Sequence, residues 1–297
     1  MRFFPVIFTH RTLLPIQASI MGLLFCTAAY SASPDTQADI GYTFDDNVTR
    51  AQEGGNKLTD QSLSANLSQP ATFPISDHTR VLLTGTLGAE KFLHYDGLSR
   101  LTGSIQGEFQ YRSSAEFGTP VLALFAKISA EEYRSDQRDG LRYSAGISLR
   151  KPLTDRIRIF GAVAHNERNG NNAVFDNKDN SARINLDYQL KASGTLYMGG
   201  EYRKGDIVIS APYWNVYGSA YTPDDVFRDW QLYNYRLDGT TALYKLGYNL
   251  ALGPRDSIDI SWNRAQSKTS YVLLPSWNEC SVSYTTNQYS LVYLVRF

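Results

Sequence analysis

Few residues of this chain have the types and spacing that catalysis requires, and the best pair stands at the ends of two segments. Asp45 and His94 would approach one another at one rim if the segments that carry them lie one strand apart in a sheet. A carboxylate beside an imidazole can activate a water molecule by general base catalysis. Solvated polar residues at a rim explain the same pair without any catalysis. A hydrolase at the rim is therefore the third of three hypotheses for this chain.

Resemblance to known enzymes does not strengthen that hypothesis. The stretch His165-Asn166-Glu167-Arg168-Asn169-Gly170 resembles the His-x-Ser-Asn-Gly stretch of outer-membrane phospholipases. In that family the serine two places after the histidine is the nucleophile, and here Glu167 holds that position, so the nucleophile is missing. Asp45 and His94 resemble the Asp and His pairs of outer-membrane aspartyl-type proteases, whose other motifs this chain lacks. We therefore expect no enzyme activity.

Metal, cofactor and nucleic-acid binding are not expected either. The acidic clusters lack the spacing of a calcium loop with its closing Glu; they are Asp45-Asp46-Asn47, Asp176 to Asp179 and Asp224-Asp225. Cys26 lies in the predicted signal peptide, residues 1–31, which leaves Cys280 without a disulfide partner and without a Cys/His metal motif. The 29 basic and 29 acidic residues balance, so the chain has no basic excess for nucleic acid.

Alternation of apolar and polar residues is the main structural signal, and it places these side chains on strands. Between Leu101 and Arg112 every second residue is apolar or Gly and the others are polar, which is the period of a strand. Such runs are ~10–12 residues long, whereas strands of globular domains usually stop near ~5–6 and tilted membrane strands need ~9–11. Because lipid excludes open sheet edges, membrane strands must close into a barrel. A soluble β-sandwich is the alternative.

Twelve segments follow this pattern, and the links between them alternate in length. We expect strands at residues 37–48, 58–69, 79–93, 100–112, 120–133, 141–151, 156–167, 180–191, 194–206, 239–252, 256–267 and 284–297. Short links carry turn residues, as at Pro152–Asp155, whereas Arg168–Asp179, Ile207–Asp238 and Lys268–Tyr284 are long. Short turns at one end and long loops at the other are typical of an all-β, transmembrane, antiparallel up-and-down β-barrel of about twelve strands.

Both ends of the chain agree with export to the outer membrane. Residues 1–31 are predicted to be a cleavable signal peptide, with a polar start, an apolar stretch from Leu13 to Thr27 and small residues after it. Residues 32–297 then form the barrel domain. The last strand carries Tyr289, Leu291, Tyr293, Val295 and Phe297 on one face, which resembles the terminal assembly signal of outer-membrane barrels. The resemblance implies that the barrel-assembly machinery binds this strand.

Together these features resemble a Gram-negative outer-membrane β-barrel of porin-like type. The strings Gly41 to Arg50 and Glu201 to Asp206 are similar to stretches in uncharacterised barrels, some linked to export of polysaccharide or surface lipoprotein. The family implies contact with outer-membrane lipid and lipopolysaccharide, and leaves the oligomeric state open.

Strand parity then divides the charges that would face the lumen into two arcs. The first five strands carry the acidic residues Asp39, Asp45, Glu90, Glu108 and Glu131. Strands six to nine carry the basic residues Arg142, Arg150, Arg158, Arg183, Lys191 and Arg203. In a closed barrel these arcs would face each other and set a transverse field across a pore. The alternative is a network of internal salt bridges that plugs the lumen.

We therefore predict a porin-like channel for small hydrophilic, charged solutes. The second hypothesis is an accessory barrel for export of a surface polysaccharide or protein. The aromatic-rich link Ile207–Asp238 could fold inward and narrow the pore, stack on sugars outside, or pack over the rim, and the sequence does not separate these.

Overall fold

A computed structural model of the chain describes residues 36–52, 54–191 and 193–297. The predicted signal peptide, residues 1–31, lies outside the described residues. No helix in the described ranges is long and apolar enough to cross a membrane.

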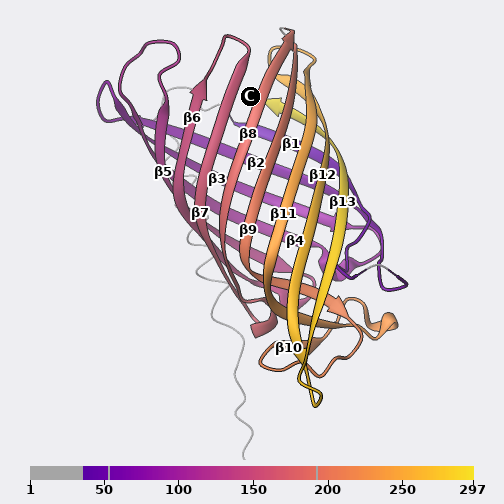
Figure 1. Ribbon diagram of the computed structural model, residues 1–297. Helices are drawn as coiled ribbons and strands as arrows, with labels where there is room; N and C mark the ends of the chain where they lie inside the picture. The colour runs from indigo at the N-terminus through magenta and orange to yellow at the C-terminus, as the bar shows by residue number, and fades with distance from the viewer. Residues whose placement is uncertain (1–35, 53, 192) are drawn as a thin grey trace, which may run out of the picture.

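Twelve long strands form one closed antiparallel barrel (Figure 1), which confirms the predicted fold class. Each strand pairs with its neighbours in the chain; β9 pairs with β11, and β13 pairs with β1 to close the ring. The strands are β1 (Gln37–Asp45), β2 (Asp60–Pro74), β3 (Thr79–Phe92), β4 (Arg100–Arg112), β5 (Val121–Tyr133), β6 (Gly140–Pro152), β7 (Ile157–Gly170), β8 (Asn177–Lys191), β9 (Gly194–Ala211), β11 (Tyr233–Ala251), β12 (Asp256–Leu273) and β13 (Asn278–Arg296). A short strand, β10 (Ala220–Pro223), adds to the start of β11 outside the ring.

The two ends of the barrel differ in their links. Residues 75–78, 153–156 and 252–255 are tight turns at the end where β1 begins and β13 finishes. The links 46–59 and 212–232 lie at the other end, together with the 3₁₀ turns η2 (Asp96–Leu98), η3 (Asp136–Arg138), η4 (Ala173–Phe175) and η5 (Arg228–Trp230). Long loops of such barrels face the cell exterior, so we name this second end the outer end.

The outward face of the wall is apolar and exposed. Leu101, Ile184 and Leu246 have exposed fractions of 59%, 56% and 44%, although each belongs to the regular wall. Apolar surface of this extent is unfavourable in water by about 25 cal/mol per Å² and is stable against lipid. Along β12 the outward residues change from Ile260 and Trp262 to Arg264, which marks the outer edge of the lipid-facing band. The molecule is an outer-membrane, membrane-spanning β-barrel.

Four neighbouring strands, β9, β11, β12 and β13, continue beyond this band toward the outer end. They have 18 or 19 residues, against 13 to 15 for β2 to β8. Their inner faces there are apolar and form a buried cluster of Ile207, Ile209, Ala211, Tyr235, Leu237, Val282 and Tyr284, joined by Val216 from the following loop. The predicted loop Lys268–Tyr284 is therefore wrong: it is a hairpin whose turn is residues 274–277. The link Ile207–Asp238 is likewise shorter than predicted, because strand pairing continues to Ala211 and resumes at Tyr233.

Candidate pore and its outer mouth

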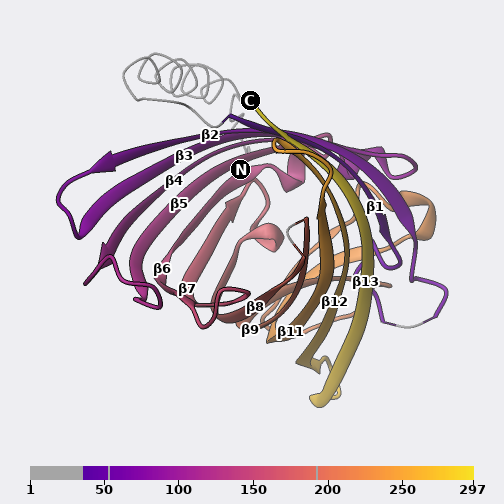
Figure 2. The ribbon, with the colours of Figure 1, turned by 90° about the horizontal axis from the view of Figure 1, so that it is seen from above.

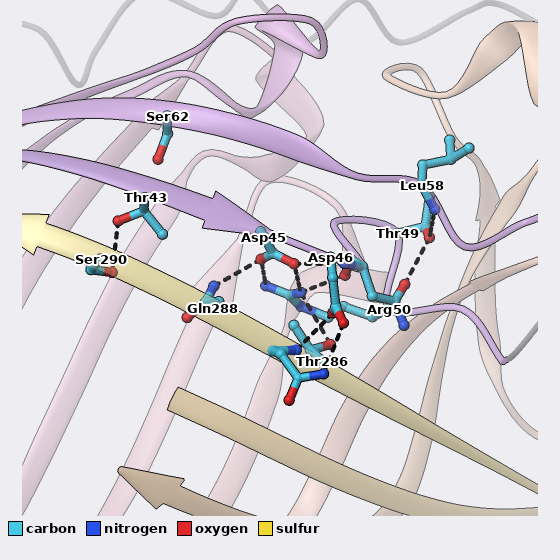
Figure 3. A network of polar contacts seen from close by, with 12 residues as sticks. Thr43, Asp45, Asp46, Thr49, Arg50, Leu58, Ser62, Thr286, Gln288 and Ser290 are labelled. Atoms are coloured by element: carbon cyan, nitrogen blue, oxygen red, sulfur yellow. Dashed lines mark hydrogen bonds and ion pairs between the residues drawn. The ribbon is translucent and has the colours of Figure 1, made fainter. Parts of the chain in front are cut away.

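Asp45 lies at the outer mouth, where the β1–β2 link turns back over the end of the strand. The guanidinium of Arg50, in that link, is 2.8 Å from the Asp45 carboxylate (Figure 3). Gln288 of β13 donates a hydrogen bond to the same carboxylate at 2.8 Å, and Arg50 also donates to Thr286. Asp45 is 4% exposed. It is therefore neutralised by a residue that follows it by five positions and does not act as a free charge on the wall.

The carboxylate of Glu131, also at the outer mouth, forms ion pairs with two arginines. Its carboxylate is 3.1 Å from Arg142 of β6 and 2.9 Å from Arg168 of β7. Arg168 is buried and also donates to the backbone carbonyl of Phe175 in η4. Glu90 is likewise 2.9 Å from Arg100 on the neighbouring strand. These ion pairs join adjacent strands and the first turns of the outer links, so they fix the shape of the mouth.

The inner half of the lumen is different, because its inward cations form no such ion pairs among the residues that the structure describes. Arg150 of β6 and Arg183 of β8 both face inward, on either side of Phe160 of β7. Their guanidinium carbons are 5.9 and 5.1 Å from the centroid of the Phe160 ring. Neither forms an ion pair with a carboxylate in the described part of the chain. Both side chains are exposed, although they point into the barrel.

Of the other residues predicted to line the lumen, some contact polar or charged side chains, and others form no such contact among the described residues. Arg203 is 2.6 Å from Glu201 two residues earlier on β9. Asp39 accepts a hydrogen bond from Asn66, and Glu108 accepts from Gln106 and Gln110. Arg158 stands opposite Asp187 in register without an ion pair between them, and Lys191 lies at a register shift of the β8–β9 hairpin, where parity no longer fixes its direction. The picture of two uncompensated walls is therefore wrong for much of the mouth, where pairs form between neighbours.

Residues 212–232, which we call the cap loop, lie at the outer end of the barrel (Figure 1). They leave from β9 and return to β11, on the opposite side of the ring from the β3–β4 link. Phe227 of the cap loop nevertheless packs edge-on against Tyr95 of that link, with ring centroids 4.9 Å apart. Phe227 is 1% exposed and belongs to a buried cluster with Val48, Leu58 and Leu98. The cap loop therefore crosses the mouth, and of the three alternatives for this loop, packing over the rim is the one observed.

Polar contacts hold the cap loop to a third part of the rim. The guanidinium of Arg138, in η3, is 3.0 Å from the carboxylate of Asp224, which is fully buried. Asp224 also accepts the backbone N–H of Val226 at 2.9 Å, and Ser135 donates to Asp225. The acidic pair of the cap loop is thus used for attachment to the β5–β6 link.

Seen from above, the ring of strands is flattened in outline rather than circular (Figure 2). A cavity of about 220 Å³ lies at the outer mouth, between the β1–β2 link, the ends of β9 and β13, and the cap loop. Arg50, Asn56, Trp214 and Tyr284 contribute to its lining. Trp214 is held there by stacking on Tyr271, with centroids 5.1 Å apart and ring planes at 7°.

The rim pair proposed for catalysis is not formed. His94 bonds to Asp60, at 2.8 Å from Nδ1, and not to Asp45. Both Asp60 oxygens also accept backbone N–H groups, from Gln61, His94 and Tyr95, so this carboxylate fixes the start of the β3–β4 link. His165 faces outward and contacts Asn180. The hydrogen-bond partners of these two histidine side chains in the described part of the chain are Asp60 and Asn180.

The carboxylate of Asp46, in the β1–β2 link, has a lowered pKa. Burial raises the pKa of Asp46, but hydrogen bonds from the side chain and the backbone N–H of Asn287 outweigh burial and lower it overall. Lys57 lies 3.3 Å away and acts in the same direction. Asp46 thus ties the β1–β2 link to β13 as an anion.

The terminal strand is placed as its pattern indicates. Tyr289, Leu291 and Tyr293 face outward on β13 and are 52%, 49% and 44% exposed. Val295 shares their parity, and Phe297 follows the strand with its N–H bonded to the carbonyl of Thr36 at 2.9 Å. Recognition by the assembly machinery remains a prediction.

Sequence reasoning missed the arginines that neutralise the mouth. Arg50 and Arg138 lie in links, where parity gives no direction, and Arg168 falls one residue beyond the expected end of its strand. A search for an arginine within a few residues of each strand-end carboxylate would have found Arg50. The contact between Arg138 and Asp224 spans 86 positions and leaves no local signal.

No family model matches this chain, and no curated protein matches it by sequence. Among solved structures, an outer membrane channel from Pseudomonas putida F1 matches with a TM-score of 0.56 and 12% identity, over 91% of this chain and 98% of that one. The NanC porin matches with a TM-score of 0.45 and 7% identity, over 88% and 99%. An anion-selective porin from Comamonas acidovorans matches with a TM-score of 0.40 and 7% identity, over 89% and 99%. At these identities the first match shows the fold alone, that of an outer-membrane channel barrel, and the other two add no argument.

Proposed function

We propose that this protein is a porin-like outer-membrane channel for small hydrophilic solutes. The observation that carries the proposal is the exposure of charged side chains that point inward in the inner half of the barrel: Arg80, Lys127, Arg150, Arg158 and Arg183. An ionised side chain is very unfavourable in a dry interior without a partner. Their exposure inside a closed wall therefore supports a water-filled lumen over a packed one.

The outer mouth supports a restricted rather than a wide passage. The cap loop crosses it and packs on the opposite rim, so solutes would pass beside this loop. The cavity lined by Arg50, Asn56 and Trp214 is the best candidate for that opening. A restricted mouth favours small solutes over polymers, which is why we rank the export hypothesis second.

The proposal includes no enzyme activity. Two observations support leaving it out: Asp60 and Asp224 accept backbone N–H groups as structural contacts, and His165 faces outward.

Conductance in planar bilayers tests the proposal directly. The full chain, refolded in detergent and shown to be heat-modifiable, should give discrete current steps in potassium chloride. Liposomes that contain it should also swell in small sugars faster than empty liposomes. Folded protein that gives neither current nor swelling would refute the channel and favour a plugged barrel or an export accessory.

A further inference from the structure

We propose that Arg150 and Arg183 form a binding site for the oxyanion group, carboxylate or phosphate, of solutes that pass through the lumen. This inference rests on the proposed channel and specifies the class of solute it favours. It depends on three observations: the absence of carboxylate partners, the position of Phe160, and the exposure of both guanidiniums.

The first observation is a contrast among inward arginines. Arg100, Arg142 and Arg203 lie 2.9, 3.1 and 2.6 Å from the carboxylates of Glu90, Glu131 and Glu201. Their N–H groups are therefore already engaged by carboxylates. Arg150 and Arg183 have no carboxylate within ion-pair distance among the residues that the structure describes.

Two carboxylates on the neighbouring strand positions do not remove this contrast. Glu201 stands opposite Arg183 in register, but its ion pair is with Arg203, through Oε1. Asp187 stands opposite Arg158, which is the next inward residue after Phe160 on β7, toward the inner end. The surroundings of Arg150 and Arg183 therefore keep an excess of positive charge.

Phe160 fixes the two charged groups in the same place. It lies on β7 between the strands that carry Arg150 and Arg183, and both guanidiniums lie within 6 Å of its ring centroid. The two guanidinium carbons are consequently at most about 11 Å apart. A guanidinium that contacts an aromatic face keeps its N–H edge free for hydrogen bonds.

These properties suit an oxyanion in transit. A guanidinium donates two parallel hydrogen bonds to the two oxygens of a carboxylate or a phosphate, whereas chloride is a single acceptor atom and does not match this pair. Because both side chains are exposed to the lumen, a bound anion exchanges with water and the site does not trap it. Conduction requires such a balance, with binding strong enough to admit the ion and weak enough to release it.

Block of the chloride current by added oxyanions tests the site. Inorganic phosphate and succinate are added separately to the wild-type channel in potassium chloride, and each blocking constant is measured. The variant with Arg150→Gln and Arg183→Gln should require at least about tenfold more of the blocking anion, the loss expected for charge-assisted hydrogen bonds. Block by phosphate alone, by succinate alone or by both supports the site and names its preferred anion.

Two further variants separate specific binding from charge. Arg142→Gln with Arg203→Gln removes the same formal charge from engaged arginines, and should change the block by less than about twofold by the same reasoning. Arg150→Lys with Arg183→Lys keeps the charge but loses the planar donor pair, and should weaken the block to an intermediate degree. A conducting channel that neither anion blocks, or whose block is equal in both Gln variants, would overturn this site and leave the channel standing. A folded wild-type protein without current would instead overturn the proposed function.

Discussion

Replacement of Phe227 by alanine should release the cap loop from the far rim. Phe227 is 1% exposed and packs on Tyr95 and Leu98, across the mouth from the strands that hold the loop. Truncation of a buried phenylalanine costs about 3–5 kcal/mol in packed cores, and we take about 3 because this cluster is small. Since about 1.4 kcal/mol changes an equilibrium constant tenfold, the detached population should rise roughly 100-fold.

Trypsin provides a direct assay, because Arg228 follows Phe227 in the cap loop. Cleavage of a transiently opened segment follows the population of the open state when opening is fast. Phe227→Ala should therefore be cut at Arg228 roughly 100-fold faster than wild type, with the barrel still heat-modifiable. Its bilayer current should also show more frequent and larger open levels.

Phe117→Ala is the matched control. Phe117 is 63% exposed in the β4–β5 link at the inner end, so its truncation should leave cleavage at Arg228 unchanged. If Phe227→Ala fails to fold, Phe227→Leu gives a smaller change in the same direction. Equal cleavage rates for folded wild type and folded Phe227 variants would refute the idea that this contact holds the loop.

Three other predictions concern assembly, register and pH. Deletion of Phe297 should reduce the heat-modifiable form in outer membranes, and normal assembly would contradict its role in the assembly signal. Leu186→Arg should impair folding by ~2–4 kcal/mol, as a lipid-facing charge does, while Asp187→Asn should be tolerated; equal behaviour in a refolding assay would show that the parity is wrong. Because the pKa of Asp46 is lowered in the folded state, its carboxylate stabilises the protein above the ordinary carboxyl pKa, and this contribution is lost as pH falls through the lowered value. As pH falls from about 5 to about 3, the free energy of unfolding measured in denaturant titrations should therefore decrease less for Asp46→Asn than for wild type. An equal decrease in the two proteins would exclude that role.

Strand positions within the lipid band were predictable because two physical constraints act on every residue there. The segment 100–112 was expected from alternation and is β4 without any change of bounds. Lipid selects apolar residues outside and the lumen selects polar residues inside, so polarity reports direction at each position. The count of twelve strands and the closed ring follow from that alternation and from the absence of open edges in lipid.

Strand ends beyond the lipid band were not predictable in the same way. At Ile207 and Ile209 the inward residues become apolar because they belong to a buried cluster, whereas Asp206 and Ser210 on the opposite face of the strand are polar. The alternation with period two continues there, but the apolar residues of the cluster now face inward instead of outward. Polarity therefore suggested that the strand had ended, and the expected loop 207–238 was too long for that reason.

The face of the strand on which a side chain lies also does not show which charged groups neutralise each other. Glu131 and Arg142 were assigned to opposing arcs, yet they are close neighbours on β5 and β6. Arg168 joins them from β7, although the sequence placed it in a loop. Parity gives the face of a side chain, whereas ion pairing depends on register and on the reach of arginine across a neighbouring strand.

The distribution of paired and unpaired arginines suggests a division of labour along the axis of the barrel. At the outer mouth, Arg138 and Arg168 are committed to carboxylates and to carbonyls of the links, and losing either partner would leave a charge with little solvent. These contacts hold the mouth and the cap loop in one arrangement. Arg150 and Arg183, closer to the inner end, contact only an aromatic ring among the partners described, and their charges remain accessible to water. A rigid mouth can restrict the size of a solute, while accessible guanidiniums can discriminate its charge, so the two selections would act at different depths and could be removed separately by mutation.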